Sequence, residues 1–435
     1  MTMCTRIERG SILGFEIFFL VSCLITSCGK ETRPDATFTD KPGGEKPVSG
    51  FATPPGDRIT EEKATAPSSP TSVNTAGPEV TGVNIDSDDS TATRPVNDTA
   101  ARELSRFDAA AGADLLGGYK FYFGNLHGHT EYSDGMGTPA EAFAWARDQV
   151  GFDFYAVTDH DHLLDLNEWL DTGAQAEAFT KEGVFLALRG FEYTHNVTGH
   201  INVLFTDEYA TTIRYPYLIF FYDWLDSASG LAQFNHPGRE PALFNDFIYL
   251  DRVADNVALI ETCNKQIDNT DGSYLPYYTR CLDKGWRVAP AAGQDNHTLT
   301  AYRHRTVYLG DALSRTELFA AITARRLYSS DDPNMKVVFK YGDRFMGSVV
   351  AVRGRFARFT VWVADDEPIQ AMKLITNAGE TAAEIAYSEE KNEVLWRPWV
   401  RLAGRGYFFL KVIALNRYDE GETLQTAVTA PIWVR

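Results

Sequence analysis

Between about residues 102 and 333, short apolar runs alternate with segments of helical periodicity, and this alternation constrains the fold more than any other feature. The run Phe154-Tyr155-Ala156-Val157 is typical of a buried strand. Before it, Thr138-Pro139-Ala140-Glu141 has the pattern of a helix N-terminus with a capping box. Strands that alternate with helices predict an α/β fold built around a parallel sheet.

Other apolar runs give the remaining elements. Further strands are expected at 121–126, 184–188, 201–205, 231–234, 257–260 and 288–291, and a last helix is expected to begin at Ser314. From about residue 334 the helical periodicity stops, and the chain continues as apolar runs separated by Gly, Asn and Asp turns, as at 359–363, 372–375 and 407–412. We therefore predict a β-sandwich accessory domain over 334–435.

The N-terminus resembles an export signal. Arg6 and Arg9 precede an apolar run, 12–25, which is short for a transmembrane span. The run ends at Ser27-Cys28-Gly29 in the pattern of a lipobox, and Cys23 fits the same pattern. We expect residues 1–28 to be a signal peptide with a lipid-modified Cys, and an ordinary cleaved signal is the alternative. The protein would then be exported to the cell envelope and lipid-anchored to the membrane, on its periplasmic or cell-surface side.

Residues 29–101 differ sharply in composition from the α/β region. Nine Pro lie among Thr, Ser, Gly and acidic residues, and Phe38 and Phe51 are the only aromatic residues. Such a segment buries too little apolar surface to offset its chain entropy. It is expected to be a disordered linker between the membrane anchor and a barrel at 102–333.

The net charge limits the classes of molecule that the protein can bind, and the cysteine positions bear on disulfide formation. The net charge of −18 argues against a nucleic-acid polymer as a partner, because such binding depends on many Lys and Arg contacts to phosphate. A small anionic substrate stays open, since bound metals can invert the local field. Cys263 and Cys281 lie beyond the signal, and their spacing leaves open whether they pair or remain thiols.

All nine His lie within the α/β region, and most stand next to an expected strand end. His127-Gly128-His129 follows the first strand, and Asp159-His160, Glu192, His236 and Asp295-Asn296-His297 also stand at the ends of strands, whereas His200 lies at the start of one. The carboxyl ends of barrel strands share one rim, so these side chains are expected to converge at a solvent-reaching rim. Imidazole with carboxylate suits zinc, manganese or iron.

As an ordered set, these motifs resemble those of the PHP (polymerase and histidinol phosphatase) superfamily of metallohydrolases. The similar segments are 126–130 with Asp134-Gly135, 157–161, 190–192, 199–203, 234–238 and 294–297. Within the superfamily, the chain looks like secreted members with a C-terminal β-domain, a branch related to carbamate-hydrolysing enzymes. The resemblance implies a distorted (β/α)7 barrel, similar to a TIM barrel, with a trinuclear metal centre.

The resemblance also implies which residues hold two to three divalent ions (Mn, Zn or Fe). One metal would take His127, His129 and Asp295. A second would take His200 and His236, with Glu192 bridging these two metals. The third would take Asp134, His160 and His297.

The activity that the resemblance implies is metal-dependent phosphoester hydrolysis, in which a metal-bridging hydroxide attacks a small phosphomonoester or phosphodiester. The residues predicted as catalytic are Glu192, Asp159, His160 and Arg305. Among these, Asp159 would orient an imidazole, and Arg305, like Arg239 and Arg303, would hold phosphate.

Two alternatives remain open. A hydrolase of carbamate, carboxyl ester or amide bonds could use the same site, with an aromatic wall from Tyr193, Phe221, Tyr222 and Trp224. A non-catalytic surface-binding lipoprotein is the other alternative, and the complete ligand set argues against it.

Overall fold

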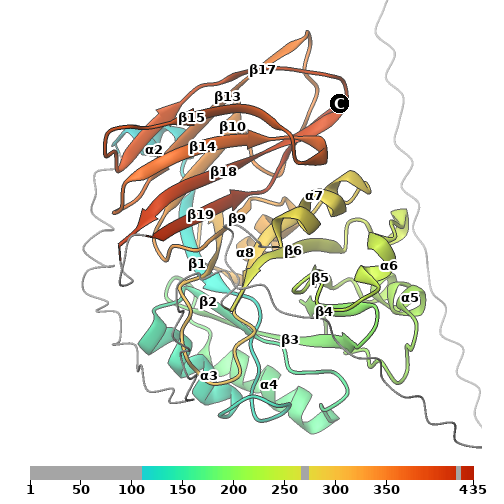
Figure 1. Ribbon diagram of the computed structural model, residues 1–435. Coiled ribbons are helices and arrows are strands. Elements are labelled where there is room, and N and C mark those ends of the chain that lie inside the picture. Colours follow the sequence, from blue (N-terminus) through green and yellow to red (C-terminus); the bar gives the residue numbers. More distant parts are fainter. Residues whose placement is uncertain (1–109, 266–273, 418–422) are drawn as a thin grey trace, which may run out of the picture. The chain divides into compact units, whose positions relative to one another are not determined.

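The computed structural model describes residues 110–265, 274–417 and 423–435. The predicted signal peptide and linker, 1–28 and 29–101, lie outside the described residues. The described chain is mixed α/β, with one large sheet of fifteen strands and a second sheet of five (Figure 1).

Strands β1 to β7 correspond to the seven predicted apolar runs, whereas β8 and β9 were not predicted. Their bounds are β1 (Lys120–Asn125), β2 (Phe154–Val157), β3 (Leu186–His195), β4 (Gly199–Leu204), β5 (Leu231–Phe234), β6 (Val257–Asn264), β7 (Ala289–Gly293), β8 (Arg305–Gly310) and β9 (Leu327–Ser330). In the large sheet they lie in the order β9-β8-β1-β2-β3-β4-β5-β6-β7. All seven strands expected in this region are thus present, and β3 and β6 continue several residues beyond their apolar runs.

The sequence predicted a parallel sheet, but this sheet is parallel only in part. Strands β1, β2 and β3 are parallel, and so are β5, β6 and β7, but β4 is antiparallel to both β3 and β5. Only residues 196–198 connect β3 to β4, and a parallel crossover needs a dozen residues or more. Because β4 is reversed, its first residues lie beside the carboxyl ends of β3 and β5.

Hydrogen bonds connect β7 back to the strands at the other end of this row. The side chain of Asn125, in β1, donates to the carbonyl oxygen of Ala292, in β7, at 2.7 Å. The backbone N–H of Ala292 donates to the hydroxyl of Thr306, in β8, at 2.8 Å. The row from β1 to β7 therefore curves back on itself.

The helices of this region are α3 (Pro139–Trp145), α4 (Leu166–Phe179), α5 (Leu218–Ala228), α6 (Leu243–Phe247), α7 (Leu275–Asp283) and α8 (Arg315–Thr323). The predicted capping box of α3 is present, since the Thr138 hydroxyl accepts from the Glu141 N–H and the Glu141 carboxylate accepts from the Thr138 N–H. Helices α3 and α4 lie beside β2 and β3 (Figure 1). Their buried side chains include Phe143 and Trp169.

The C-terminal region is built almost entirely of strands, as predicted. They are β10 (Lys336–Tyr341), β11 (Arg344–Phe345), β12 (Val349–Val350), β13 (Phe356–Ala364), β14 (Ile369–Ile375), β15 (Thr381–Ala386), β16 (Glu393–Trp396), β17 (Trp399–Arg401), β18 (Gly406–Asn416), β19 (Thr423–Thr429) and β20 (Ile432–Val434). Strand β19 pairs with β9, so the large sheet runs across the expected domain boundary at 333/334. One core cluster contains Leu126, Val307 and Val361. Separate domains at 102–333 and 334–435 therefore stay a prediction.

Two smaller points concern the membrane and the thiols. None of the described helices combines the length and the apolar character that a membrane crossing requires. Cys263 and Cys281 are buried thiols, and no disulfide joins them.

Candidate metal centre

The segment after β1 brings two imidazoles together at the centre of the site. His127 and His129 are completely buried, and their Nε2 atoms are 3.2 Å apart. The residue between them is Gly128, where an added Cβ would lie 1.9 Å from the hydroxyl oxygen of Tyr155. Tyr155 belongs to the neighbouring strand β2, so glycine is required for the loop to pack this closely.

The carboxylate of Glu192 lies among five imidazoles. Its Oε1 is 3.2 Å from Nε2 of His127, 3.3 Å from Nδ1 of His200 and 3.4 Å from Nε2 of His236. Its Oε2 is 2.8 Å from Nδ1 of His160 and 3.7 Å from Nε2 of His129. One carboxylate therefore faces nitrogen donors on four chain segments.

The position of Glu192 differs from the expectation of a solvent-reaching rim. Strand β3 extends to His195, so Glu192 lies inside the strand, and its side chain is completely buried. The ladder to β4 holds it there, because Thr194 is paired with His200 across the two strands. The reversal of β4 thus brings His200 to the same carboxylate as the ligands that follow β1, β2 and β5.

Asp295 completes the first predicted ligand group. Its Oδ1 is 3.2 Å from Nε2 of His129 and 3.5 Å from Nε2 of His127. Its Oδ2 faces the opposite way and lies 3.1 Å from Nη1 of Arg239 and 3.1 Å from Nζ of Lys265. The carboxylate therefore connects the imidazoles to two cationic side chains.

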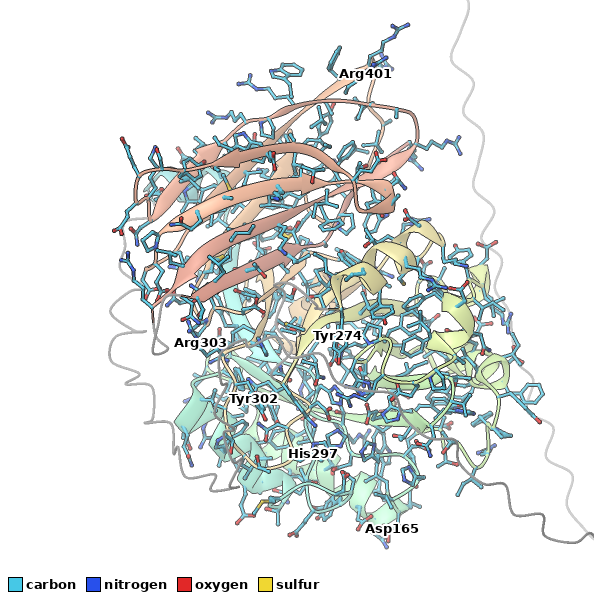
Figure 2. The ribbon with its side chains drawn as sticks, in the orientation of Figure 1. Asp165, Tyr274, His297, Tyr302, Arg303 and Arg401 are labelled. Atoms are coloured by element: carbon cyan, nitrogen blue, oxygen red, sulfur yellow. The ribbon has the colours of Figure 1, made fainter. Side chains whose placement is uncertain are left out.

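The third predicted group lies on the more open side of the site. Oδ1 of Asp134 is 3.1 Å from Nε2 of His297 and 3.4 Å from Nε2 of His160. The Asp134 side chain is 52% exposed, whereas that of His127 is fully covered. Figure 2 labels His297, which follows β7. Donor atoms of this group and of His129 all lie within 4.8 Å of one another.

The nine residues predicted as ligands thus form one cluster, and its donor atoms fit divalent cations. Both ring nitrogens of His236 and Nδ1 of His200 are buried and make no hydrogen bond in the described part of the chain. Unpaired buried nitrogens are costly, and several groups of three or more donors lie within 4.8 Å of one another. Imidazole and carboxylate together suit zinc, manganese or iron. The assignment of individual ligands stays a prediction.

Burial and carboxylates compete within this cluster: burial lowers the pKa of His129 to about 4, whereas carboxylates prevail at His127 and His236. Burial alone would lower the pKa of His127, but Glu261, Glu192 and Asp295 raise it to about 10. Burial is likewise outweighed at His236, where Glu192 and Glu240 raise the pKa to about 9. The imidazoles of His127, His160 and His200 hold the pKa of Glu192 well below its usual range, against the effect of burial. Metal binding must therefore displace protons from the rings of His127 and His236.

Glu261 was not identified from the sequence. It lies in β6, is completely buried, and its Oε1 is 2.8 Å from Nδ1 of His127. Its Oε2 accepts the backbone N–H of His236 at 2.7 Å. An added Cβ at Gly293 would lie 1.8 Å from Oε1, so that glycine makes room for the carboxylate. The signal was a Glu directly after the apolar run 257–260, because such a residue is rarely buried without a partner.

Glu240 is the second residue that sequence reasoning missed. Its carboxylate oxygens lie 3.7 Å from Nε2 of His200 and 3.7 Å from Nδ1 of His236. It follows His236 by four residues, in a turn that the sequence did not define.

Asp159 contacts the site through a loop. It accepts hydrogen bonds from the N–H and the hydroxyl of Thr130 and from the hydroxyl of Ser133. The Ser133 hydroxyl oxygen lies 3.4 Å from Nδ1 of His129. Asp159 therefore fixes the loop that precedes Asp134, and it reaches an imidazole only through Ser133.

The three arginines near the ligand motifs have different surroundings. Arg305 donates to the carbonyl oxygens of Tyr302, Arg303 and His304 and stacks on the ring of Phe152. These contacts hold its own loop, and they give no support to the predicted role in catalysis. Arg303 donates to Gln425, in β19, and to Asp332. Arg239 alone contacts a candidate ligand, Asp295.

The aromatic wall considered for an ester substrate is part of the core instead. Tyr193, Phe221, Tyr222 and Trp224 are all buried and belong to one hydrophobic cluster. The rings of Tyr193 and Phe221 stack with centroids 4.0 Å apart. These four residues therefore pack against each other and do not offer an open apolar surface.

Three residues of the site have left-handed backbone conformations. The φ angles are 27° for His236, 45° for Asp295 and 52° for Lys265. Such conformations cost about 1–3 kcal/mol each for residues other than glycine and concentrate at functional sites.

Comparison with known proteins found a likeness of low identity to a solved structure. No protein-family model matches the chain, and no curated protein is significantly similar to it. One similar solved structure is a two-domain protein containing a predicted PHP-like metal-dependent phosphoesterase from Bacteroides vulgatus. The identity is 18%, the match covers 68% of this chain and 91% of that chain, and the TM-score is 0.41. At these values the likeness assigns no function.

Proposed function

We propose that this chain is a metal-dependent phosphoesterase of the PHP type, with a distorted (β/α)7 barrel, that acts on a small phosphomonoester or phosphodiester. The observation that carries the proposal is the buried carboxylate of Glu192 facing five imidazoles from four chain segments. Collecting so many polar groups in a buried place costs stability, since desolvation exceeds what such pairs return. Divalent cations would offset that cost and explain why the donor atoms converge.

The residues that would hold two to three cations (Mn, Zn or Fe) form three groups. His127, His129 and Asp295 form one group, and Glu192 with His200 and His236 forms the second. Asp134, His160 and His297 form the third. Bound cations would supply Lewis acidity and activate water as a nucleophile at neutral pH.

Two cationic side chains at the edge of the site, Arg239 and Lys265, favour a phosphate ester over a neutral ester or carbamate as the substrate. Arg239 and Lys265 both approach Oδ2 of Asp295 at 3.1 Å, and their side chains are 41% and 33% exposed. They can therefore meet an anionic group that arrives from solvent. Guanidinium and ammonium donors suit phosphate oxygens, whereas the buried cluster around Tyr193 and Phe221 offers no open apolar wall to a neutral ester.

The exposed fractions of the candidate ligands indicate the side from which a substrate would enter the site. Asp134, His160 and His297 have side chains that are 52%, 12% and 23% exposed, whereas His236 is only 1% exposed. A substrate arriving from solvent would meet the open group first. Glu261 holds the ring of His127 from behind, so that its Nε2 faces the centre.

The deciding experiment uses the full chain with added Mn²⁺ or Zn²⁺ and three substrates: p-nitrophenyl phosphate, bis-p-nitrophenyl phosphate and naphthyl carbamate. We expect metal-dependent hydrolysis of a phosphate ester. Hydrolysis of the carbamate alone would move the assignment to the ester and carbamate class. Bound metal with no hydrolysis of any substrate would favour a non-catalytic surface-binding protein.

We further propose that the protein is exported and lipid-anchored through Cys28 or Cys23. The basis is the sequence pattern around these residues alone. Labelling with palmitate should depend on one of the two cysteines, and label that survives replacement of both would refute the anchor.

A further inference from the structure

Aromatic and arginine side chains share one exposed face at the end of the five-stranded sheet. Strand β17 pairs with β13 so that Arg401 lies opposite Phe356 and Trp399 lies opposite Arg358. Phe356 is 56% exposed and Trp399 is 63% exposed. The guanidinium of Arg358 lies 5.7 Å from the centre of the Trp399 ring. Arg401 marks this face in Figure 2.

Four further arginines lie close to these strands along the chain, in sequence segments without acidic residues. Arg353, Arg355, Arg397 and Arg405 are exposed, and no Asp or Glu occurs within 351–363 or 394–405. The ion pairs found among the described residues involve none of the six arginines. We call these six arginines with Phe356 and Trp399 the Arg/aromatic patch. Such a basic cluster is unusual in a chain whose net charge is −18.

Only one end of this sheet face is open. Trp362 is on the same side of β13 as Phe356 and Arg358, and it is buried. Helix α2 (Ala110–Leu116) covers it there, since an added Cβ at Gly112 would lie 2.6 Å from the Trp362 ring. Among the described residues, α2 covers the apolar end of this face and nothing covers the Arg/aromatic end.

We propose that the Arg/aromatic patch binds the surface of an anionic phospholipid membrane. Arginines near such a surface each add attraction to lipid headgroups, and this attraction decays within a Debye length of about 8 Å at physiological salt. Exposed Trp and Phe add burial at the level of the headgroups. A flat membrane can contact the patch without wrapping around the acidic remainder of the chain. A long flexible polyanion would meet that acidic surface as well.

The test measures co-sedimentation of the full chain with vesicles of phosphatidylcholine, with and without one third phosphatidylglycerol. We expect binding that requires phosphatidylglycerol and weakens at high salt. Replacing Arg353, Arg358 and Arg401 by Ser should weaken the partition coefficient at least about tenfold. The control replaces Arg214, Arg252 and Arg287 by Ser, which removes the same charge from exposed positions elsewhere, and it should bind like wild type.

A second variant separates the aromatic from the electrostatic contribution. Phe356→Ser with Trp399→Ser keeps every arginine, and it should also weaken vesicle binding while circular dichroism and Tm stay unchanged. All variants share the same N-terminal residues, so any binding through those residues is common to them. Equal binding by the patch and control variants would overturn the proposal. So would patch-dependent binding to an anionic polysaccharide without vesicle binding, or a patch-dependent dimer in light scattering.

Discussion

Nδ1 of His127 lies 2.8 Å from Oε1 of Glu261, and both side chains are completely buried. With Nδ1–H donating to this carboxylate, Nε2 is the ring nitrogen that faces Glu192 and Asp295, which lie 3.2 Å and 3.5 Å away, and it would bind a cation after losing its proton. The same carboxylate accepts the N–H of His236. One buried Glu on β6 therefore orients two candidate ligands on different segments.

Glu261→Gln should weaken metal binding by about 10–100-fold, because the imidazole of His127 loses its charged partner. The affinity is measured by titration with Zn²⁺ or Mn²⁺, with circular dichroism to show that the fold persists. The control is Glu182→Gln, an exposed change on the same kind of side chain. Unchanged metal affinity in Glu261→Gln would mean that the Glu261 side chain contributes packing alone and does not tune His127.

Glu192→Gln should lower kcat by about two orders of magnitude or more at saturating Mn²⁺ and weaken one metal. The change preserves size, but it removes the charge that five imidazoles face and replaces one oxygen by an NH₂ that cannot ligate. Activity within about threefold of wild type, roughly 0.7 kcal/mol in the barrier, would exclude Glu192 from the site.

The purified full chain should contain two to three equivalents of divalent metal by elemental analysis. Replacing His127 and His129 by Ala should remove at least one equivalent and abolish turnover, because both Nε2 atoms face the same centre. His162→Ala is the control, since His162 is exposed. A normal metal content in the double variant would refute the assignment of this pair.

Arg239→Gln and Lys265→Gln should each raise KM for p-nitrophenyl phosphate by about tenfold or more, as expected when a charged hydrogen bond is lost. Metal content, measured in parallel, should remain, because both side chains contact the Asp295 oxygen that faces away from the imidazoles. If KM is unchanged while metal content falls, the two cations stabilise Asp295 and do not bind substrate.

Asp153, which lies outside the metal centre, is expected to make the stability of the fold depend on pH. Burial raises its pKa to about 6, although the N–H of Phe123 and the charge of Arg305 act in the opposite direction. The folded protein therefore favours the protonated carboxyl. The protonated Asp153 carboxyl stabilises the fold fully below about pH 4, the pKa of Asp153 in the unfolded chain. This stabilisation is lost as the pH rises through about 6, the pKa in the folded protein.

Asp153→Asn should consequently raise the free energy of unfolding at pH 8 but not at pH 4. The difference is on the order of 3 kcal/mol at most, from the separation of the two pKa values. Chemical denaturation at both pH values measures it, with the exposed change Asp226→Asn as control. A variant that is equally destabilised at both pH values would contradict this account.

The sequence by itself determined most of the elements and the donor set. Apolar runs and helical capping patterns give local structure because they depend on neighbouring residues only, so β2, β5 and the capped start of α3 lie where they were predicted. The candidate ligands could be identified because His and acidic residues at strand ends share one edge of a sheet whatever the details of packing.

Tertiary structure alone decided the direction of β4, the burial of Glu192 and the part played by Glu261. The reversal of β4 follows from its short connection to β3, and it brings His200 to a carboxylate eight residues earlier in the chain. Glu261 is distant in sequence from His127, and only the curvature of the sheet places β6 behind β1. Strand periodicity says which residues share a face, but it says nothing about which faces meet, because that depends on packing between segments far apart in the chain.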